Sequence, residues 1–126
     1  FTEKYKEKLL ALQKILKSVK IKAKDYSEVL KDSKEGDFVF LDPPYIEEKK
    51  YSFNYNKNDF FDIKQLKTQL KILDTKGVKW MMTQVDTPQV RGLFKDYSYL
   101  VYNNPSAFVN IPLNNKKEVI ITNYIK

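Results

Sequence analysis

The chain has 126 residues, of which 42% are hydrophobic and 14% aromatic, so it fits one small globular domain with its own core. It contains neither Cys nor His, which excludes thiol and imidazole catalysis, disulfide bonds and the usual zinc ligand sets within these residues. The formal net charge of +7 agrees either with a nucleic-acid partner or with a merely lysine-rich composition, because only Arg91 among the 23 basic residues is an arginine.

The first predicted element is an amphipathic helix from Thr2 to Lys20, because apolar residues recur there at helical spacing among lysines. The apolar positions are Tyr5, Leu9, Leu12, Leu16 and Val19. The alternating stretch VKIKA (19–23) predicts a short strand, and DYSEVLKDS (25–33) predicts a brief helix or a turn.

A continuous apolar run from Phe38 to Leu41 predicts a strand that is buried on both faces. The two prolines at positions 43 and 44 end it, since neither can donate a hydrogen bond to a neighbouring strand. The residues from Tyr45 to Phe61 show no clean period and carry several aromatic rings among Lys and Asn, so we predict a long loop.

The second half of the chain predicts two helices and three strands. Asp62 is suited to cap a helix that runs to about Asp74 and closes at Gly77. The remaining elements are a strand in VKWMMT (78–83), a helix from about Pro88 to Lys95, and strands in YSYLVY (97–102) and EVIITNY (118–124). This order of strands and helices predicts an α/β fold that ends in an antiparallel strand pair. No repeat or linker divides residues 1–126, so we expect a single domain.

The tetrapeptide DPPY (42–45) directly follows the predicted strand. In open α/β sheets, ligands bind beyond the carboxyl ends of the strands. A carboxylate and backbone carbonyls held in one rigid, proline-fixed bend are acceptors suited to an amino group, and the following tyrosine offers a flat face for stacking on a planar base. The alternative is a plain turn from strand to loop.

These residues resemble the catalytic motif of amino-group DNA methyltransferases. Further segments are similar in order and spacing to the carboxyl-terminal half of the Dam-type N6-adenine methyltransferases, from about Ala23 to Tyr124. They are KDYSEVL, GDFVFLDPPY, YSFNYNKNDF, MMTQVDTPQVRGLF and the terminal EVIITNY. The resemblance implies part of a Rossmann-like, S-adenosylmethionine-dependent methyltransferase sheet and the transfer of a methyl group to the N6 amine of adenine.

The resemblance implies that Asp42, Pro43, Pro44 and Tyr45 form the catalytic site. The carboxylate of Asp42 and the carbonyl of Pro43 would accept the two N–H bonds of the adenine amine. Tyr45 would stack on the base, which must leave double-stranded DNA to reach a pocket. No metal ion is implied.

For the cofactor S-adenosylmethionine, the resemblance implies contacts from Asp42, Asp25 and Tyr26. A helix cap and a half-buried core residue are equally good readings of Asp25 and Tyr26. For DNA, the aromatic loop supplies candidates for base stacking and phosphate contacts, or for pinning the loop to the domain. These candidates are Tyr51, Phe53, Asn54, Tyr55 and Lys57. Thr83, Asp86 and Arg91 fit equally a pocket rim and the start of a helix.

The sequence departs from the family in its glycines. Dam-type enzymes open with an F-x-G-x-G segment that holds the cofactor, and none of the three glycines here forms it. We therefore expect a partial methyltransferase catalytic domain without the first cofactor-binding strands, with residues 1–20 forming a helix from the end of the target-recognition region. Such a chain would be inactive alone, would expose a hydrophobic sheet edge, and would need its amino-terminal half or a complementing chain.

Two other functions stay open: methylation of RNA adenine, and a non-catalytic nucleic-acid-binding remnant. The family resemblance suggests a restriction-modification setting in a bacterium, phage or virus. No run of about 18 apolar residues and no cleavable leader occurs, so we expect a cytoplasmic protein with no membrane partner.

Overall fold

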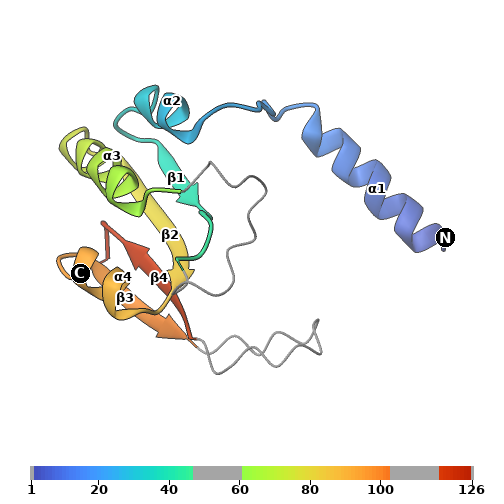
Figure 1. Cartoon of the computed structure of the whole chain (residues 1–126). Coiled ribbons are helices and arrows are strands. Elements are labelled where there is room, and N and C mark those ends of the chain that lie inside the picture. Colours follow the sequence, from blue (N-terminus) through green and yellow to red (C-terminus); the bar gives the residue numbers. More distant parts are fainter. Residues whose placement is uncertain (1, 47–60, 103–116, 126) are drawn as a thin grey trace.

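The computed structural model describes residues 2–46, 61–102 and 117–125. In these segments the chain forms a four-stranded mixed sheet in the order β1-β2-β4-β3 (Figure 1). The strands are β1 (Phe38–Leu41), β2 (Lys79–Val85), β3 (Ser98–Tyr102) and β4 (Glu118–Thr122). β1 and β2 are parallel, whereas β4 pairs antiparallel with both β2 and β3. The α/β class and the final antiparallel pair are thereby confirmed.

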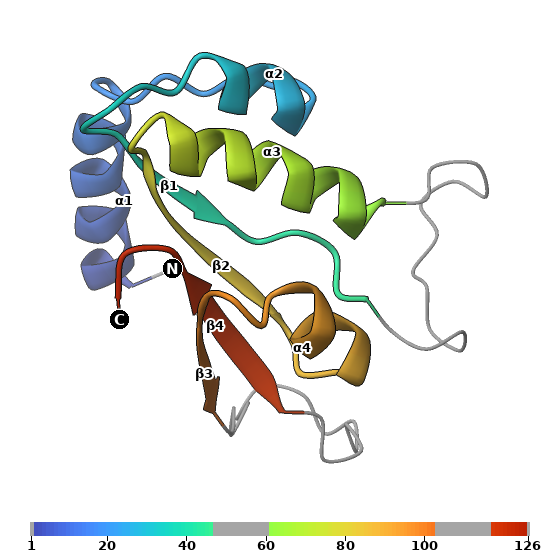
Figure 2. The same ribbon diagram turned by 90° about the vertical axis from the view of Figure 1, so that its left-hand side faces the viewer.

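Three helices pack against one face of this sheet (Figures 1 and 2). They are α2 (Tyr26–Lys31), α3 (Ile63–Thr75) and α4 (Pro88–Leu93). Alternate residues of β2 and β4 meet their apolar sides, because successive strand side chains point to opposite faces. The resulting core contains Trp80, Met82, Val119 and Ile121 from the strands and Leu66, Leu70, Leu73, Val90 and Phe94 from or beside the helices.

The boundaries of α3 follow from local chemistry. The carboxylate of Asp62 accepts hydrogen bonds from the backbone N–H groups of Lys64 and Gln65, which caps the first turn. At the other end Gly77 has a φ of 71°. The N–H of Val78 then bonds the carbonyl of Leu73, so the helix closes in a Schellman motif. The predicted start and end of this helix are both confirmed.

The opposite face of the sheet is exposed over much of β1 and β3 in the described part of the chain, whereas Val85 and Thr122 on that face are buried. Phe38 and Phe40 in β1 are 55% and 58% exposed, and Leu100 in β3 is 61% exposed. The prediction that β1 is buried on both faces is therefore wrong. The physical reason is that β1 forms an edge of the sheet and the helices cover only the side to which Val39 and Leu41 point.

The first helix, α1 (Glu3–Leu16), extends away from the sheet (Figure 1) and has no buried residue. Its predicted apolar positions are present but face solvent; Tyr5 and Leu9, for example, are 64% and 52% exposed. The prediction of a strand at 19–23 is wrong, because residues 18–25 pair with no strand of the described sheet. Among the described residues, no helix has the length and apolar character needed to cross a membrane.

Candidate functional site

Asp42 lies one residue beyond β1, on the open face of the sheet. The parallel register pairs Leu41 with Met82, so the next pair along is Asp42 and Thr83. The hydroxyl of Thr83 donates a hydrogen bond of 2.6 Å to Oδ1 of Asp42. Within the described segments no donor reaches the second carboxylate oxygen, Oδ2, so the side chain is oriented by one oxygen while the other stays available as an acceptor.

The backbone of the DPPY bend is held by one buried side chain, Gln84, whose exposed fraction is 0%. Its Nε2 donates to the carbonyl of Pro44 at 3.1 Å, and its Oε1 accepts from the N–H of Ile46 at 2.9 Å. The same oxygen accepts from the N–H of Val85 at 2.9 Å. The amide thus pairs with the backbone on both sides of Tyr45, as a neighbouring strand would.

Tyr45 meets the carboxylate of Glu118, which lies at the start of β4. Partial burial and the nearby charge of Glu118 raise the pKa of Tyr45 to about 12. Tyr102, the partner of Glu118 in the β3–β4 ladder, donates a 2.6 Å hydrogen bond to Oε2 of Glu118. That hydrogen bond and partial burial likewise raise the pKa of Tyr102 to about 12. Both phenols stay protonated at neutral pH, and that of Tyr102 donates to Glu118.

A second charged cluster follows β2. The side chain of Asp86 is only 5% exposed and receives two hydrogen bonds from the Arg91 guanidinium, at 2.7 and 2.5 Å. The hydroxyl of Tyr99 donates to the same carboxylate at 2.9 Å. The Arg91 hydrogen bond holds the pKa of Asp86 below its usual range. Asp86 and Arg91 therefore connect the start of α4 to β3 and have a structural role. Thr83, by contrast, contacts Asp42.

Asp25 and Tyr26 make contacts expected of structural residues. Oδ1 of Asp25 accepts from the N–H and the hydroxyl of Ser27, which caps α2 and lowers the pKa of Asp25. Tyr26 packs edge-on against Phe61 with ring centroids 6.0 Å apart. Their role toward a cofactor stays a prediction.

The five residues predicted to contact DNA all lie outside the described residues, so their role also stays a prediction. They are Tyr51, Phe53, Asn54, Tyr55 and Lys57. In the described part of the chain, no group of three or more acidic side chains is arranged to hold a metal ion.

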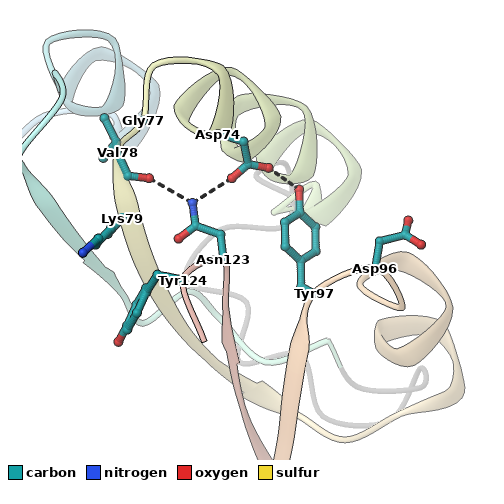
Figure 3. A pocket seen from close by; sticks show the side chains of 8 residues that line it. All are labelled: Asp74, Gly77, Val78, Lys79, Asp96, Tyr97, Asn123 and Tyr124. Carbon is teal, nitrogen blue, oxygen red and sulfur yellow. Dashed lines mark hydrogen bonds between the residues drawn. The ribbon is translucent and has the colours of Figure 1, made fainter. Parts of the chain in front are cut away.

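A shallow hollow lies at the other end of the sheet and is lined by residues that hold one another (Figure 3). Asn123 donates to Asp74 at 2.8 Å and to the carbonyl of Val78 at 2.9 Å, and Tyr97 donates to Asp74 at 2.6 Å. The indole N–H of Trp80 also reaches Asp74, at 2.8 Å. Because these bonds tie the end of α3 to β2, β3 and β4, the cluster is structural and not the candidate site.

Three site residues were not singled out in the sequence: Gln84, Glu118 and Tyr102. Gln84 continues the apolar run VKWMMT at a position that alternates with Trp80 and Met82. This pattern is the signal that would have identified it, since an amide on the inward face of a strand needs polar partners nearby. Glu118 and Tyr102 face each other only once β3 and β4 are in register, which no local pattern specifies.

Comparison with known proteins shows which family the chain belongs to. Residues 1–108 match the family model described as D12 class N6 adenine-specific DNA methyltransferase. The chain is also 30% identical, over 115 residues, to the Type II methyltransferase M1.LlaDCHI of Lactococcus lactis subsp. cremoris. That alignment includes 85% of this chain but 40% of the relative, so the chain spans about two fifths of the length of the protein it matches. With its acid-and-tyrosine bend at the end of β1, the chain belongs to the D12 class N6 adenine-specific DNA methyltransferases.

Proposed function

We propose that the protein carrying this chain transfers a methyl group from S-adenosylmethionine to the N6 amine of an adenine in double-stranded DNA, at Asp42 to Tyr45. The observation that carries the proposal is the oriented carboxylate of Asp42. One oxygen is fixed by Thr83, the other is free of described donors, and the bend that follows is fixed by a buried amide.

Adenine's exocyclic amine is a weak nucleophile because its lone pair is delocalised into the ring. Oδ2 of Asp42 and the carbonyl of Pro43 are acceptors for its two N–H bonds, which localises the lone pair on nitrogen. The rigid bend keeps these acceptors in place before the substrate arrives, so little reorganisation is needed during the reaction. The proton that N6 gives up leaves along the hydrogen bond to Asp42.

The residues present fit the charge of the cofactor. S-adenosylmethionine, when bound, supplies an electrophilic methyl group on a positively charged sulfur. The carboxylate of Asp42 on the open sheet face matches that positive charge, and Asp25 with the ring of Tyr26 would hold the cofactor's adenosine end. Both carboxylates keep one oxygen that receives no hydrogen bond from the described residues.

Two observations support DNA as the substrate: the family to which the chain belongs, and the position of the candidate site at the edge of the sheet. A base inside a duplex cannot present its amine to a bend at a sheet edge, so the adenine must be extruded and stacked on Tyr45. The proposed contacts to the flanking strand are Tyr51, Phe53, Asn54, Tyr55 and Lys57, because stacking rings and lysines together suit unpaired nucleotides.

The 126 residues by themselves are proposed to be inactive. They span 40% of the methyltransferase relative, and they contain no F-x-G-x-G segment for the cofactor. Isothermal titration of S-adenosylmethionine into the isolated chain should show no binding at micromolar concentrations. Micromolar binding would contradict this part of the proposal.

The substrate is tested with the whole protein that contains this chain. It should be incubated with radiolabelled S-adenosylmethionine and either unmethylated duplex DNA or RNA of the same sequence, followed by digestion to nucleosides. We expect label in N6-methyladenine from the DNA. Label in RNA alone would assign an RNA adenine methyltransferase, and label in neither would indicate a binding remnant.

A further inference from the structure

We propose that Glu118 and Gln84 are positioning residues that fix the ring of Tyr45, Glu118 through the phenol hydroxyl and Gln84 through the backbone on either side. This inference rests on the proposed function, because it gives the Tyr45 ring the task of holding the extruded adenine. It assigns a role to two polar side chains that lie outside the Asp42 to Tyr45 motif.

Gln84 holds the backbone on both sides of Tyr45. The carbonyl of Pro44 and the N–H of Ile46 are the two polar groups that flank Tyr45, and the Gln84 amide pairs with both. With three hydrogen bonds and an exposed fraction of 0%, this amide has no freedom to rotate. The Cα of Tyr45 is therefore held against the carboxyl end of β2.

The register of the strands places the carboxylate of Glu118 near Tyr45. Glu118 pairs with Val85 in the β2–β4 ladder, which places it beside the strand end against which Tyr45 is held. On its other side it pairs with Tyr102, whose hydroxyl donates to Oε2 at 2.6 Å. That bond holds the carboxylate in one orientation. Partial burial and the nearby charge of Glu118 raise the pKa of Tyr45, and the hydrogen bond between this phenol and the carboxylate is the contact that we infer.

An aromatic ring that stacks on a base is best oriented when both its backbone and its hydroxyl are fixed. A tyrosine fixed only at its backbone still rotates about its side-chain bonds, and tyrosine torsions at the ring are broad. A hydrogen bond at the hydroxyl removes that freedom before the base arrives, so less ordering entropy is lost when the base stacks. Tyr45 is 40% exposed, so part of its surface remains accessible to a base.

A double-mutant cycle tests the hydroxyl half in the whole protein. Glu118→Gln should lower kcat for DNA methylation about tenfold with little change in KM for S-adenosylmethionine. In a Tyr45→Phe background the same change should have no further effect, because the hydroxyl it acts on is already gone. Equal losses in both backgrounds, or no loss in either, would overturn the inference.

Two further variants test the role of Gln84 and control for loss of stability: Gln84→Met and Tyr97→Phe. Gln84→Met keeps the volume of the side chain but removes all three of its hydrogen bonds to the backbone, so kcat should fall while the circular dichroism spectrum persists. Should this variant fail to fold, the Glu118 cycle still decides the inference. Tyr97→Phe is the matched control, since it loses a tyrosine–carboxylate bond at the far end of the sheet and should leave kcat unchanged. A loss of kcat in Tyr97→Phe equal to that in Glu118→Gln would show that stability, not ring position, is being measured, and would overturn the inference.

A readout without activity separates this inference from the proposed function. In protein with ¹³C-labelled tyrosine, Glu118→Gln should lower the pKa of Tyr45 from about 12, because a nearby negative charge is removed. The ring-carbon shift of Tyr45 reports that change. An unchanged titration would overturn the inference even if DNA is methylated. A lowered pKa in a protein that methylates nothing would support the contact and contradict the function.

Discussion

Thr83 fixes the orientation of the Asp42 carboxylate. Its hydroxyl bonds Oδ1 at 2.6 Å, so a rotation of the carboxylate would break a short hydrogen bond. From the sequence, Thr83 fitted a pocket rim and the start of a helix equally well. The parallel register of β1 and β2 decides between these two alternatives, because it places Asp42 beside Thr83. Local sequence patterns do not specify such a register.

Thr83→Val should lower kcat by about tenfold, because the loss of a hydrogen bond worth about 1–2 kcal/mol frees the carboxylate to turn. The measurement is steady-state DNA methylation by the whole protein. Thr68→Val serves as the control, since that hydroxyl bonds only the carbonyl of Lys64 on an exposed turn of α3. An equal drop in both variants would contradict the role assigned to Thr83.

Asp86 predicts a pH dependence of stability. Its pKa in the folded chain is lowered, chiefly by Arg91, relative to about 3.9 for an unfolded aspartate. A lowered folded-state pKa means that the stabilisation is complete above about pH 4 and is lost as the pH falls through the folded-state value. Urea unfolding at pH 7 and at pH 3 should therefore show a smaller decline for Asp86→Asn than for the parent chain. An identical decline would contradict this assignment.

At the scale of elements, helix ends were the most predictable part of the fold. Asp62 and Gly77 act through their own turns of backbone, so their sequence context is sufficient to place α3. By contrast, the alternating residues 19–23 predicted a strand that no neighbour supports. Strands exist only through partners distant in sequence, and a short alternating pattern carries no information about whether a partner is available.

Gly77→Ala should destabilise the chain by about 1 kcal/mol, because a residue with a side chain is strained at a φ of 71°. The nearest atom to an added Cβ is Cγ of Glu35 at 3.5 Å, so the cost comes from the backbone and not from a clash. Gly92→Ala is the matched control in α4, where nothing lies within 4 Å and alanine should be neutral or stabilising. Thermal unfolding of both variants checks the pair; equal midpoints would contradict the expected difference.

At the scale of the whole molecule, the described helices that pack on the sheet all lie on one of its two faces. The apolar run in β1 correctly predicted a strand, but apolar character alone does not reveal which side chains are covered. Helices α2, α3 and α4 cover one face, and Phe38, Phe40 and Leu100 remain exposed on the other. The site itself was predictable in part, since DPPY was evident in the sequence, whereas its supports came from β2 and β4.

The two faces should respond differently to truncation in the isolated chain. Phe40→Ala should cost about 1 kcal/mol, because the ring is already 58% exposed. Met82→Ala removes a side chain with an exposed fraction of 0% and should cost about 2–5 kcal/mol. Denaturant unfolding of the two variants measures the difference, and equal losses would contradict the one-sided core.

The central claim is that methyl transfer depends on the carboxylate of Asp42. The most direct test is the initial rate of N6-methyladenine formation in unmethylated duplex DNA by the whole protein and by its Asp42→Asn variant, which keeps the shape of the side chain and removes its charge. The account predicts a rate lower by a factor of about 10²–10³ with the fold intact, as expected for losing a preorganised charged contact at the reacting amine. A folded Asp42→Asn variant that methylates DNA at the parent rate would contradict it.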